Sequence, residues 1–217
     1  MFTKLLSFGD SWAYGSELPE NSKTYNQIIA DNFKISHTCY AVQATSTEHL
    51  LIQLKTAIIK EATLTNSLAI FTLTSPTRSI YFDNNIPKEI YIRNEDLISK
   101  NYFKYHWSDE LDYLKLNTVI LALQKICKEY SIQDYYVCGF SRVDIDYPGI
   151  DTTKIYNRGK NHLAGLLNCQ NPVNILNNMD FSIDRDNPYI FPNISHPNQL
   201  GHTKIAEVLY SWISNAN

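Results

Sequence analysis

The hydrophobic positions of the chain fall into short apolar runs and longer amphipathic stretches. The apolar runs predict strands over residues 4–8, 35–41, 68–74 and 135–140. Apolar residues at helical spacing predict helices over residues 22–33, 50–58, 109–130 and 199–214. Strands that alternate with helices favour an α/β fold, a three-layer α/β/α sandwich whose mostly parallel sheet has about five strands.

Two stretches break this alternation. Residues 79–108 are rich in aromatic side chains and show no regular pattern, which is typical of a lid, a binding loop or a small insertion. Residues 141–195 are also poorly patterned, with short helices expected near 158–167 and 172–178. We see no internal repeat and no linker, so residues 1–217 are predicted to form a single domain that carries an aromatic-rich insertion.

The second predicted helix follows a Thr-Ser-Thr-Glu sequence at residues 45–48. A threonine with a glutamate three residues later fits a capping box, in which each side chain satisfies a backbone N–H at the start of a helix. We therefore expect Thr45 to be the N-cap of this helix and Glu48 to be its reciprocal partner.

Composition and charge exclude several classes of function. A net charge of −3, from 19 basic and 22 acidic residues, gives no basic patch for nucleic acid. The four cysteines form no Cys-x-x-Cys pair and the six histidines form no His-Glu-x-x-His motif, so we expect no metal and no cofactor. Cys39, Cys127 and Cys138 lie in apolar runs and are expected to be reduced core residues.

The first residues run directly into a predicted strand, without the long apolar region and the cleavage site of a signal peptide. No apolar run reaches the length of a membrane span. A cytoplasmic location without a membrane partner is therefore expected.

Candidate chemistry lies at the two ends of the chain. Ser11 follows the first strand, and His196 precedes the last helix. A serine hydroxyl needs an adjacent base to act as a nucleophile, and an imidazole supplies one. Alone, Ser11 fits a turn residue that caps a helix and His196 fits a loop histidine. Together they indicate acyl-ester chemistry, at the edge of a parallel sheet where ligands bind.

The motifs around these two residues carry a resemblance. Phe-Gly-Asp-Ser-Trp at residues 8–12 and His-Pro-Asn-Gln-Leu-Gly-His at residues 196–202 resemble the first and last sequence blocks of the SGNH/GDSL hydrolase family. The resemblance implies that Ser11 is the nucleophile and that His196 is its base. The family usually has an aspartate three residues before the histidine, where this chain has Asn193. Asn193 is then expected to orient the imidazole without supplying a negative charge.

A missing aspartate leaves an alternative open, because Asp184 or Asp186 in the preceding loop can supply the carboxylate. Without such a charge the reaction is slowed: in the serine-protease triad the change of Asp to Asn costs about 10⁴ in turnover.

The resemblance also implies an oxyanion hole. Its expected donors are the backbone N–H groups of Ser11 and Ala44 and the hydroxyl of Ser75, with Thr77 as an alternative to Ser75. Alanine replaces the usual glycine and serine the usual asparagine, so the middle blocks match only by position. Losing one such donor typically costs about 10²–10³ in turnover.

Four further residues near these blocks have expected roles. Asp10 is predicted to accept backbone N–H bonds in the turn, and His202 to orient the start of the last helix. Asp10, Arg78 and Tyr81 are also candidates for contacts with substrate.

The resulting expectation is a serine esterase that forms an acyl-enzyme on Ser11 and removes small acyl groups from a carbohydrate, or transfers them to a sugar hydroxyl. The alternative is a catalytically silent binding or assembly protein of the same fold, related to a phage or to glycan synthesis, that uses residues 79–108 as its contact surface. A third reading, an unrelated α/β protein, requires both end motifs to be coincidences.

Overall fold

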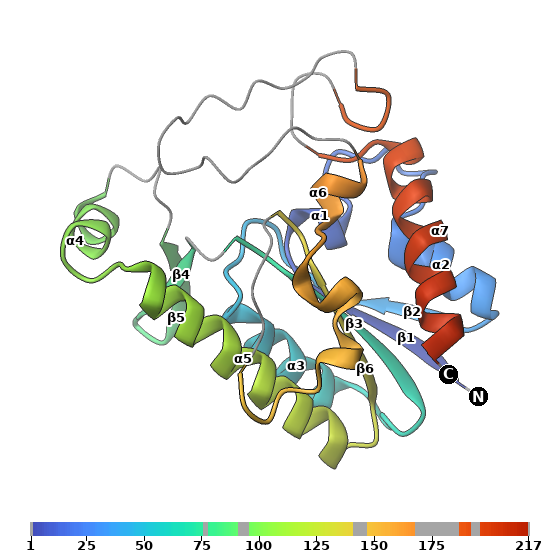
Figure 1. The fold of residues 1–217 in the computed structure, drawn as a ribbon, viewed down its shortest axis with the longest axis horizontal. Helices are drawn as coiled ribbons and strands as arrows, with labels where there is room; N and C mark the ends of the chain where they lie inside the picture. Colours follow the sequence, from blue (N-terminus) through green and yellow to red (C-terminus); the bar gives the residue numbers. More distant parts are fainter. Residues whose placement is uncertain are drawn as a thin grey trace.

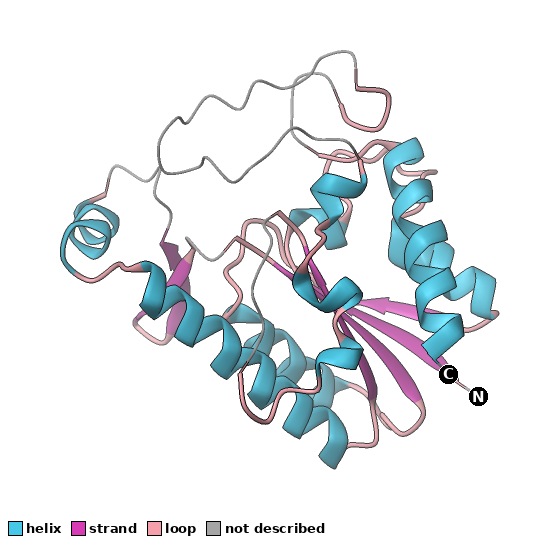
Figure 2. Ribbon diagram, in the orientation of Figure 1, coloured by secondary structure: helices cyan, strands magenta, loops and turns pink. Residues whose placement is uncertain are grey.

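A computed structural model describes residues 2–75, 78–90, 96–140, 147–167, 187–191 and 196–216. The chain forms the expected α/β fold, with a central parallel sheet between two layers of helices (Figures 1 and 2). The helix expected near residues 172–178 lies outside the described residues.

The four strands of the central sheet are all parallel and run in the order β2-β1-β3-β6. Their bounds are β1 Lys4–Phe8, β2 Ser36–Cys39, β3 Ser67–Leu73 and β6 Gln133–Cys138. The strand order reverses between β1 and β3, and ligands of such sheets bind at this switch point, beyond the carboxyl ends of the strands.

The place of the expected fifth strand, beyond β6, holds two single-residue parallel bridges in the part of the chain that is described. Tyr136 pairs with Ile155, and Cys138 pairs with His162. The 3₁₀ turn η2 (Tyr156–Gly159) lies between the two bridges. The 3₁₀ turn η1 (Thr152–Lys154) lies just before the first of them. Asn157 and Arg158 adopt positive φ angles of 46° and 53°, so the chain cannot stay extended there.

The helices cover the sheet on both faces (Figure 2). Their bounds are α1 Ser11–Tyr14, α2 Tyr25–Phe33, α3 His49–Lys60, α5 Asp109–Glu129, α6 Leu163–Leu166 and α7 Gln199–Ala216. Helices α3 and α5 pack on one face of the sheet, and α1, α2, α6 and α7 pack on the other. Each face therefore has its own apolar core.

Both cores take alternate residues of the same strands. Leu6 and Phe8 of β1 face α3 and α5, whereas Leu5 faces α2 and α7. Phe8, Phe71 and Tyr136 stack across three adjacent strands, with ring centroids 4.6 and 5.1 Å apart. This alternation explains why the buried strands read as continuous apolar runs.

The capping box expected at residues 45–48 is wrong. Helix α3 begins at His49, and Glu48, which precedes it, makes no capping bond. The Thr45 hydroxyl instead donates to the carbonyl oxygens of Val42 and Gly9, at 3.0 and 3.3 Å. The threonine therefore fastens the loop after β2 to the turn after β1.

The expected core position of Cys39 is also wrong, because it is exposed at the end of the edge strand β2, whereas Cys127 and Cys138 are buried as expected. Cys169 lies outside the described residues.

The aromatic-rich segment has more regular structure than its pattern suggests. Strands β4 (Ser79–Asp83) and β5 (Ile86–Ile90) form an antiparallel hairpin. Asn84 and Asn85 at its tip have φ angles of 49° and 64°, as a type I′ turn requires. Helix α4 (Leu97–Tyr105) follows, capped by Asp96, whose carboxylate accepts a hydrogen bond from the Ser99 N–H at 2.9 Å.

The hairpin is anchored to the start of α3. Glu89 of β5 accepts a hydrogen bond from the Ser46 N–H at 2.9 Å, and its other carboxylate oxygen lies 2.8 Å from Nδ1 of His49. Ser79 of β4 donates to Glu48 at 2.9 Å. The segment thus lies beside the face that α3 and α5 cover (Figure 1).

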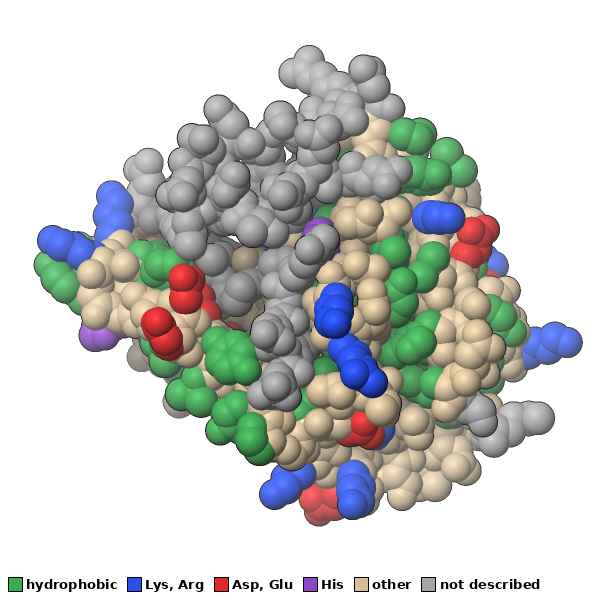
Figure 3. All heavy atoms as spheres, viewed as in Figure 1, with side chains coloured by type: hydrophobic (Ala, Val, Ile, Leu, Met, Phe, Trp, Pro, Cys, Tyr) green, Lys and Arg blue, Asp and Glu red, His purple; other side chains and the backbone are tan. Residues whose placement is uncertain are grey.

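The charged side chains of the described residues are scattered over the face seen in Figure 3 and do not gather into a patch of one sign. Among the described residues, no helix is both long enough and apolar enough to cross a membrane.

Candidate active site

The turn after β1 is built around Gly9. Its φ of 147° and the space beside it exclude a side chain, because a Cβ there would lie 2.8 Å from Cβ of Thr72 and 2.9 Å from Cβ of Ala13. The Gln53 side chain of α3 satisfies both backbone groups of Gly9: its Oε1 accepts from the N–H at 2.8 Å, and its Nε2 donates to the carbonyl at 2.9 Å. The side chain of Gln53 therefore holds the backbone of this turn in place from the side of α3.

Asp10 directs the chain into the single turn of α1. Its fully buried carboxylate accepts hydrogen bonds from the Trp12 N–H at 3.1 Å and from the Thr74 hydroxyl at 2.8 Å. The Arg78 guanidinium lies 3.4 Å from the same carboxylate. Asp10 thus has the structural role expected of it, and Ser11 becomes the first residue of a capped helix.

Arg78 and Trp12 both contact Phe140 beside the turn after β1. The Arg78 guanidinium also donates to the carbonyl of Thr45 at 3.2 Å and lies 5.8 Å from the ring centroid of Phe140. The edge-to-face contact of Trp12 with Phe140 has a centroid distance of 5.0 Å. The residue after Ser11 is therefore part of the packed core.

His196 is presented by a short antiparallel contact between residues 187–191 and the start of the last motif. Ile190 bridges Pro197, and the Phe191 N–H donates to the carbonyl of His196 at 3.0 Å. This pairing supports the backbone on either side of the imidazole.

Asn198 and Gly201 of the motif shape the start of α7. Asn198 accepts from the Gly201 N–H at 3.1 Å, and its amide donates to the carbonyl of Pro188 at 2.8 Å. A Cβ on Gly201 would lie 2.3 Å from the carbonyl oxygen of Tyr189, so only glycine permits this close approach. The motif's asparagine and glycine are thus explained by packing.

His202 joins the first turn of α7 to α2, in agreement with the orienting role expected of it. It is fully buried within α7, where its Nδ1 accepts a hydrogen bond from the Tyr25 N–H at 3.1 Å and so caps α2. Its ring stacks on that of Tyr25 at a centroid distance of 5.7 Å. Burial, followed by the nearby charge of His196, lowers the pKa of His202 to about 4.

The two ends of the chain meet at this edge of the sheet. Nε2 of His196 lies 2.9 Å from Oγ of Ser11, within hydrogen-bonding distance. Ser11 is 8% exposed, and the His196 side chain is 24% exposed. A hydroxyl that is mostly covered but still accessible, beside an imidazole nitrogen, is the arrangement that activates a serine.

A carboxylate that the sequence analysis missed lies on the other side of the imidazole. Oε2 of Glu17 is 2.6 Å from Nδ1 of His196. The direction of this contact departs from that of a straight N–H···O hydrogen bond, so it is a close polar contact between a carboxylate and an imidazole nitrogen. No motif signals Glu17, since it has neither the residue type nor the position of the family's aspartate.

The predicted oxyanion residues follow strand ends at the same edge. Ala44 has a φ of 59°, the left-handed region that favours the glycine usual at this position. Its loop is held against the turn after β1, because the Val42 N–H and the Thr45 hydroxyl both donate to the carbonyl of Gly9. Ser75 is buried directly after β3.

The other predicted site residues lie outside the described part of the chain or in the hairpin. Asn193, Thr77, Asp184 and Asp186 lie outside the described residues. Tyr81 lies in β4 of the hairpin, half-buried.

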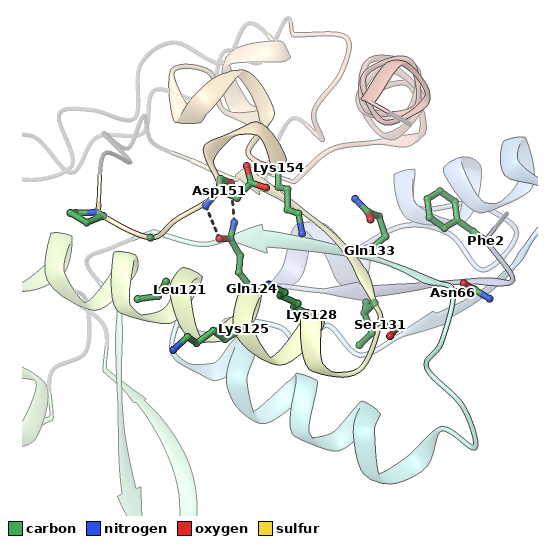
Figure 4. A pocket seen from close by; sticks show the side chains of 13 residues that line it. Phe2, Asn66, Leu121, Gln124, Lys125, Lys128, Ser131, Gln133, Asp151 and Lys154 are labelled. Atoms are coloured by element: carbon green, nitrogen blue, oxygen red, sulfur yellow. Dashed lines mark hydrogen bonds between the residues drawn. The ribbon is translucent and has the colours of Figure 1, made fainter.

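A cavity of about 820 Å³ lies at the opposite edge of the sheet (Figure 4). Phe2, Asn66 and Gln133 on its wall stand at or just before the amino ends of β1, β3 and β6, whereas Ser11 follows a carboxyl end. Gln124 exchanges two hydrogen bonds with the backbone of Asp151 there, at 3.0 and 2.8 Å. This cavity is separate from the Ser11 site.

The sequence matches no family model and no curated protein. Solved structures do match. A putative lipolytic protein of the G-D-S-L family from Desulfitobacterium hafniense DCB-2 is 12% identical, with a TM-score of 0.52 over 97% of this chain and 99% of its own. The psychrotrophic esterase EstA from Pseudoalteromonas sp., inhibited by monoethylphosphonate, is 12% identical, with a TM-score of 0.50 over 98% and 97%.

A carbohydrate esterase, described as having divergent catalytic and non-catalytic binding functions, is 9% identical, with a TM-score of 0.50 over 98% of this chain and 65% of its own. At these identities the matches concern the fold. The chain therefore has the fold of the SGNH/GDSL hydrolases, as its end motifs predicted.

Proposed function

We propose that the protein is a serine ester hydrolase with Ser11 as nucleophile and His196 as general base and acid. The observation that carries the proposal is the 2.9 Å distance between Oγ of Ser11 and Nε2 of His196, which joins residues 185 positions apart in the sequence. The likeness of the fold to esterases supports the same reaction class.

The geometry supports a two-step acyl transfer. As Oγ of Ser11 bonds to the ester carbonyl carbon, its proton moves to Nε2 of His196. The tetrahedral intermediate expels the alcohol, which takes the proton back from Nε2 and leaves an acyl group on Ser11. Water then attacks the acyl-enzyme, with Nε2 again accepting and returning the proton, and the carboxylic acid leaves.

Negative charge develops on the carbonyl oxygen in both steps and needs fixed donors. The proposed donors are the backbone N–H groups of Ser11 and Ala44 and the hydroxyl of Ser75. Their support is placement: Ser11 and Ser75 follow the two strands at the switch point, β1 and β3, and Ala44 follows the neighbouring strand β2. Asn193 keeps the orienting role that the sequence resemblance implies.

For substrate, we propose small acyl esters of carbohydrates. A carbohydrate esterase is among the proteins with a similar fold. The hairpin beside α3 offers aromatic side chains, half-buried Tyr81 and Phe82 with 61% exposure, and aromatic rings stack on sugar faces. Arg78, near the nucleophile turn, is the proposed polar contact. Asp10 holds Arg78 in place and is too buried to touch the substrate itself.

The test is hydrolysis of p-nitrophenyl acetate by the wild type, Ser11→Ala and His196→Ala. Both variants should fall by at least about 10³-fold, because removing a member of such a unit leaves little beyond binding and oxyanion stabilisation. Ser214→Ala and His106→Ala are matched controls, since both side chains are exposed and lie in α7 and at the end of α4. A fluorophosphonate probe should label the wild type on Ser11, as intact mass and peptide mapping would show.

Wild-type hydrolysis that survives Ser11→Ala would refute the proposed mechanism. If the wild type neither hydrolyses the ester nor reacts with the probe, the silent binding protein becomes the better reading. The question would then move to ligands of the hairpin and α4 segment.

A further inference from the structure

We propose that Glu17 is the positioning acid of His196, taking the place of the aspartate that the sequence lacks. This inference rests on the proposed function of Ser11 and His196 and adds a third member to their pair. Its starting point is the carboxylate oxygen of Glu17, 2.6 Å from Nδ1 on the side of the imidazole that faces away from Ser11.

Glu17 and the nucleophile belong to one short segment. The single turn of α1 ends at Gly15, whose N–H donates to the carbonyl of Ser11 at 2.9 Å, and the Ser16 N–H donates to the same carbonyl at 3.0 Å. Glu17 follows directly. The position of its backbone is thus set by two hydrogen bonds to the residue that it helps to activate, and His196 lies between the two side chains.

The backbone of Glu17 is in a conformation that glutamate disfavours. Its φ is 64°, in the left-handed region where glycine and asparagine are the usual residues. Strained backbone of this kind gathers at functional sites, where the surrounding contacts hold it. At Glu17 this backbone conformation coincides with a side chain that lies against the proposed base.

The chemistry explains what the carboxylate does. An anion against Nδ1 keeps the imidazole proton on that nitrogen, so that Nε2 presents its lone pair to the Ser11 hydroxyl. It also stabilises the imidazolium that forms when the proton of Ser11 arrives. Asn193 can accept a hydrogen bond but carries no charge, so it can supply only the first of these effects.

The Glu17 side chain is 39% exposed, which limits the size of its effect. Solvent screens the attraction between a partly exposed carboxylate and an imidazolium. We therefore expect Glu17→Gln to lower kcat for p-nitrophenyl acetate by about 10–100-fold, less than the roughly 10⁴ lost in a buried triad. KM should stay within about 2-fold, because the interaction strengthens only as charge develops.

The chain offers a matched control. Glu20 lies in the same loop with an exposed side chain, and no contact joins it to His196 in the structure. Glu20→Gln makes the same change in charge and should leave kcat unchanged. Glu17→Asp keeps the charge on a shorter side chain and should recover part of the loss. Equal kcat for Glu17→Gln and Glu20→Gln would overturn the proposal.

Glu17→Gly separates positioning from folding. Glycine relieves the left-handed backbone, so the melting temperature should equal or exceed that of the wild type. Hydrolysis should still fall as it does in Glu17→Gln. A Glu17→Gly variant that is destabilised and loses activity only in proportion to its unfolded fraction would assign Glu17 a structural role and contradict the proposal.

A second readout does not depend on turnover. A carboxylate close to a protonated Nδ1 should move the resonance of that proton downfield in the proton NMR spectrum, and the signal is assigned by its absence in His196→Ala. That resonance should be present in the wild type and in Glu20→Gln, and lost or shifted upfield in Glu17→Gln. If it is unchanged in Glu17→Gln, the inference fails even where hydrolysis is Ser11-dependent. If it behaves as expected while the wild type hydrolyses nothing, only the proposed function fails.

Discussion

Ser11 and His196 meet at one point but are supported in different ways. The serine turn rests on the sheet, where Gln53 and Asp10 satisfy its backbone from buried positions. The histidine precedes α7, and among the described residues it is supported by the bridge at Pro197 and by contacts with the side chains of Ser11 and Glu17. The proposed nucleophile is therefore part of the core, whereas the proposed base lies in the segment before α7.

This contrast indicates which contacts determine the placement of Ser11 and His196 relative to each other. Substitutions of the residues that support the turn of Ser11 should lower stability and activity together, because this turn is part of the core. Changes beside the histidine should alter activity with less effect on the rest of the fold, unless they touch the start of α7. Four substitutions or conditions test this difference.

The largest effect is expected where the histidine segment contacts α7. Gly201→Ala places a Cβ 2.3 Å from the carbonyl oxygen of Tyr189, a backbone atom that cannot move alone. We expect a loss of about 3 kcal/mol in the free energy of unfolding, with His196 displaced and hydrolysis strongly reduced. Urea denaturation would measure the loss.

Gly165→Ala is the control for this change. Its Cβ would meet only the ring of His162, at 3.3 Å or more. A Gly201→Ala variant as stable as Gly165→Ala would show that the segment can adapt, and would weaken the view that the motif's glycine is fixed by packing.

Acid should weaken the contact between α2 and α7. With its pKa lowered to about 4, His202 stays neutral in the fold while the unfolded chain takes up a proton below its usual value near 6.5. Stability is therefore full above that value and falls as the pH drops from about 6.5 toward 4, by up to about 3 kcal/mol. Denaturation midpoints between pH 7.5 and 4.5 would show the slope.

His202→Gln should flatten part of that slope, at the cost of lower stability at neutral pH. Part of the slope will remain in the variant, because burial also lowers the pKa of His37 to about 4. An unchanged slope in His202→Gln would contradict the assignment of acid sensitivity to His202.

Removing the Gln53 side-chain amide should loosen the serine turn. Gln53→Leu leaves the N–H of Gly9 without its partner, which costs about 2 kcal/mol for a buried group. Gln124→Leu is a matched control, since Gln124 makes the same pair of bonds to the backbone of Asp151 near the far cavity. Both variants should lose similar stability, but only Gln53→Leu should also lower kcat. Equal kcat values in the two variants would show that the support of the turn by Gln53 does not affect the site.

The smallest effect is expected at Ala44. Ala44→Gly removes the steric cost of a side chain at a φ of 59° and should raise the free energy of unfolding by up to about 1 kcal/mol. Activity should be retained, because the backbone N–H is unchanged. Ala57→Gly in α3 should instead lose about 1 kcal/mol. A loss of hydrolysis in Ala44→Gly would indicate that the methyl group itself shapes the site.

The sequence predicted the parts of the fold that are stabilised by burial. Strand β3 is buried along its whole length, and its apolar run was unmistakable. The edge strand β2 is only half-buried and came out shorter than its pattern indicated. The Asn84-Asn85 pair is typical of a hairpin turn, but the aromatic residues around it obscured this signal.

The site was predictable to the extent that it is encoded in motifs. Ser11 and His196 were found by residue type and placement, and the structure brings them together. Glu17 was not, because its approach to His196 depends on a left-handed backbone that no periodicity reveals. The partner of His202 was not predicted for a similar reason: the Tyr25 N–H lies 177 positions away in the sequence.

The position of Trp12 allows its fluorescence to be used as a probe of the site. Its indole is 2% exposed, lies one residue from Ser11, and contacts Phe140 edge-on. Trp107 and Trp212 lie in other parts of the structure, beside Asp112 and within α7. A chain in which those two are replaced by phenylalanine would report the proposed acylation of Ser11 as a change in the emission of a single fluorophore, in real time and with unlabelled esters.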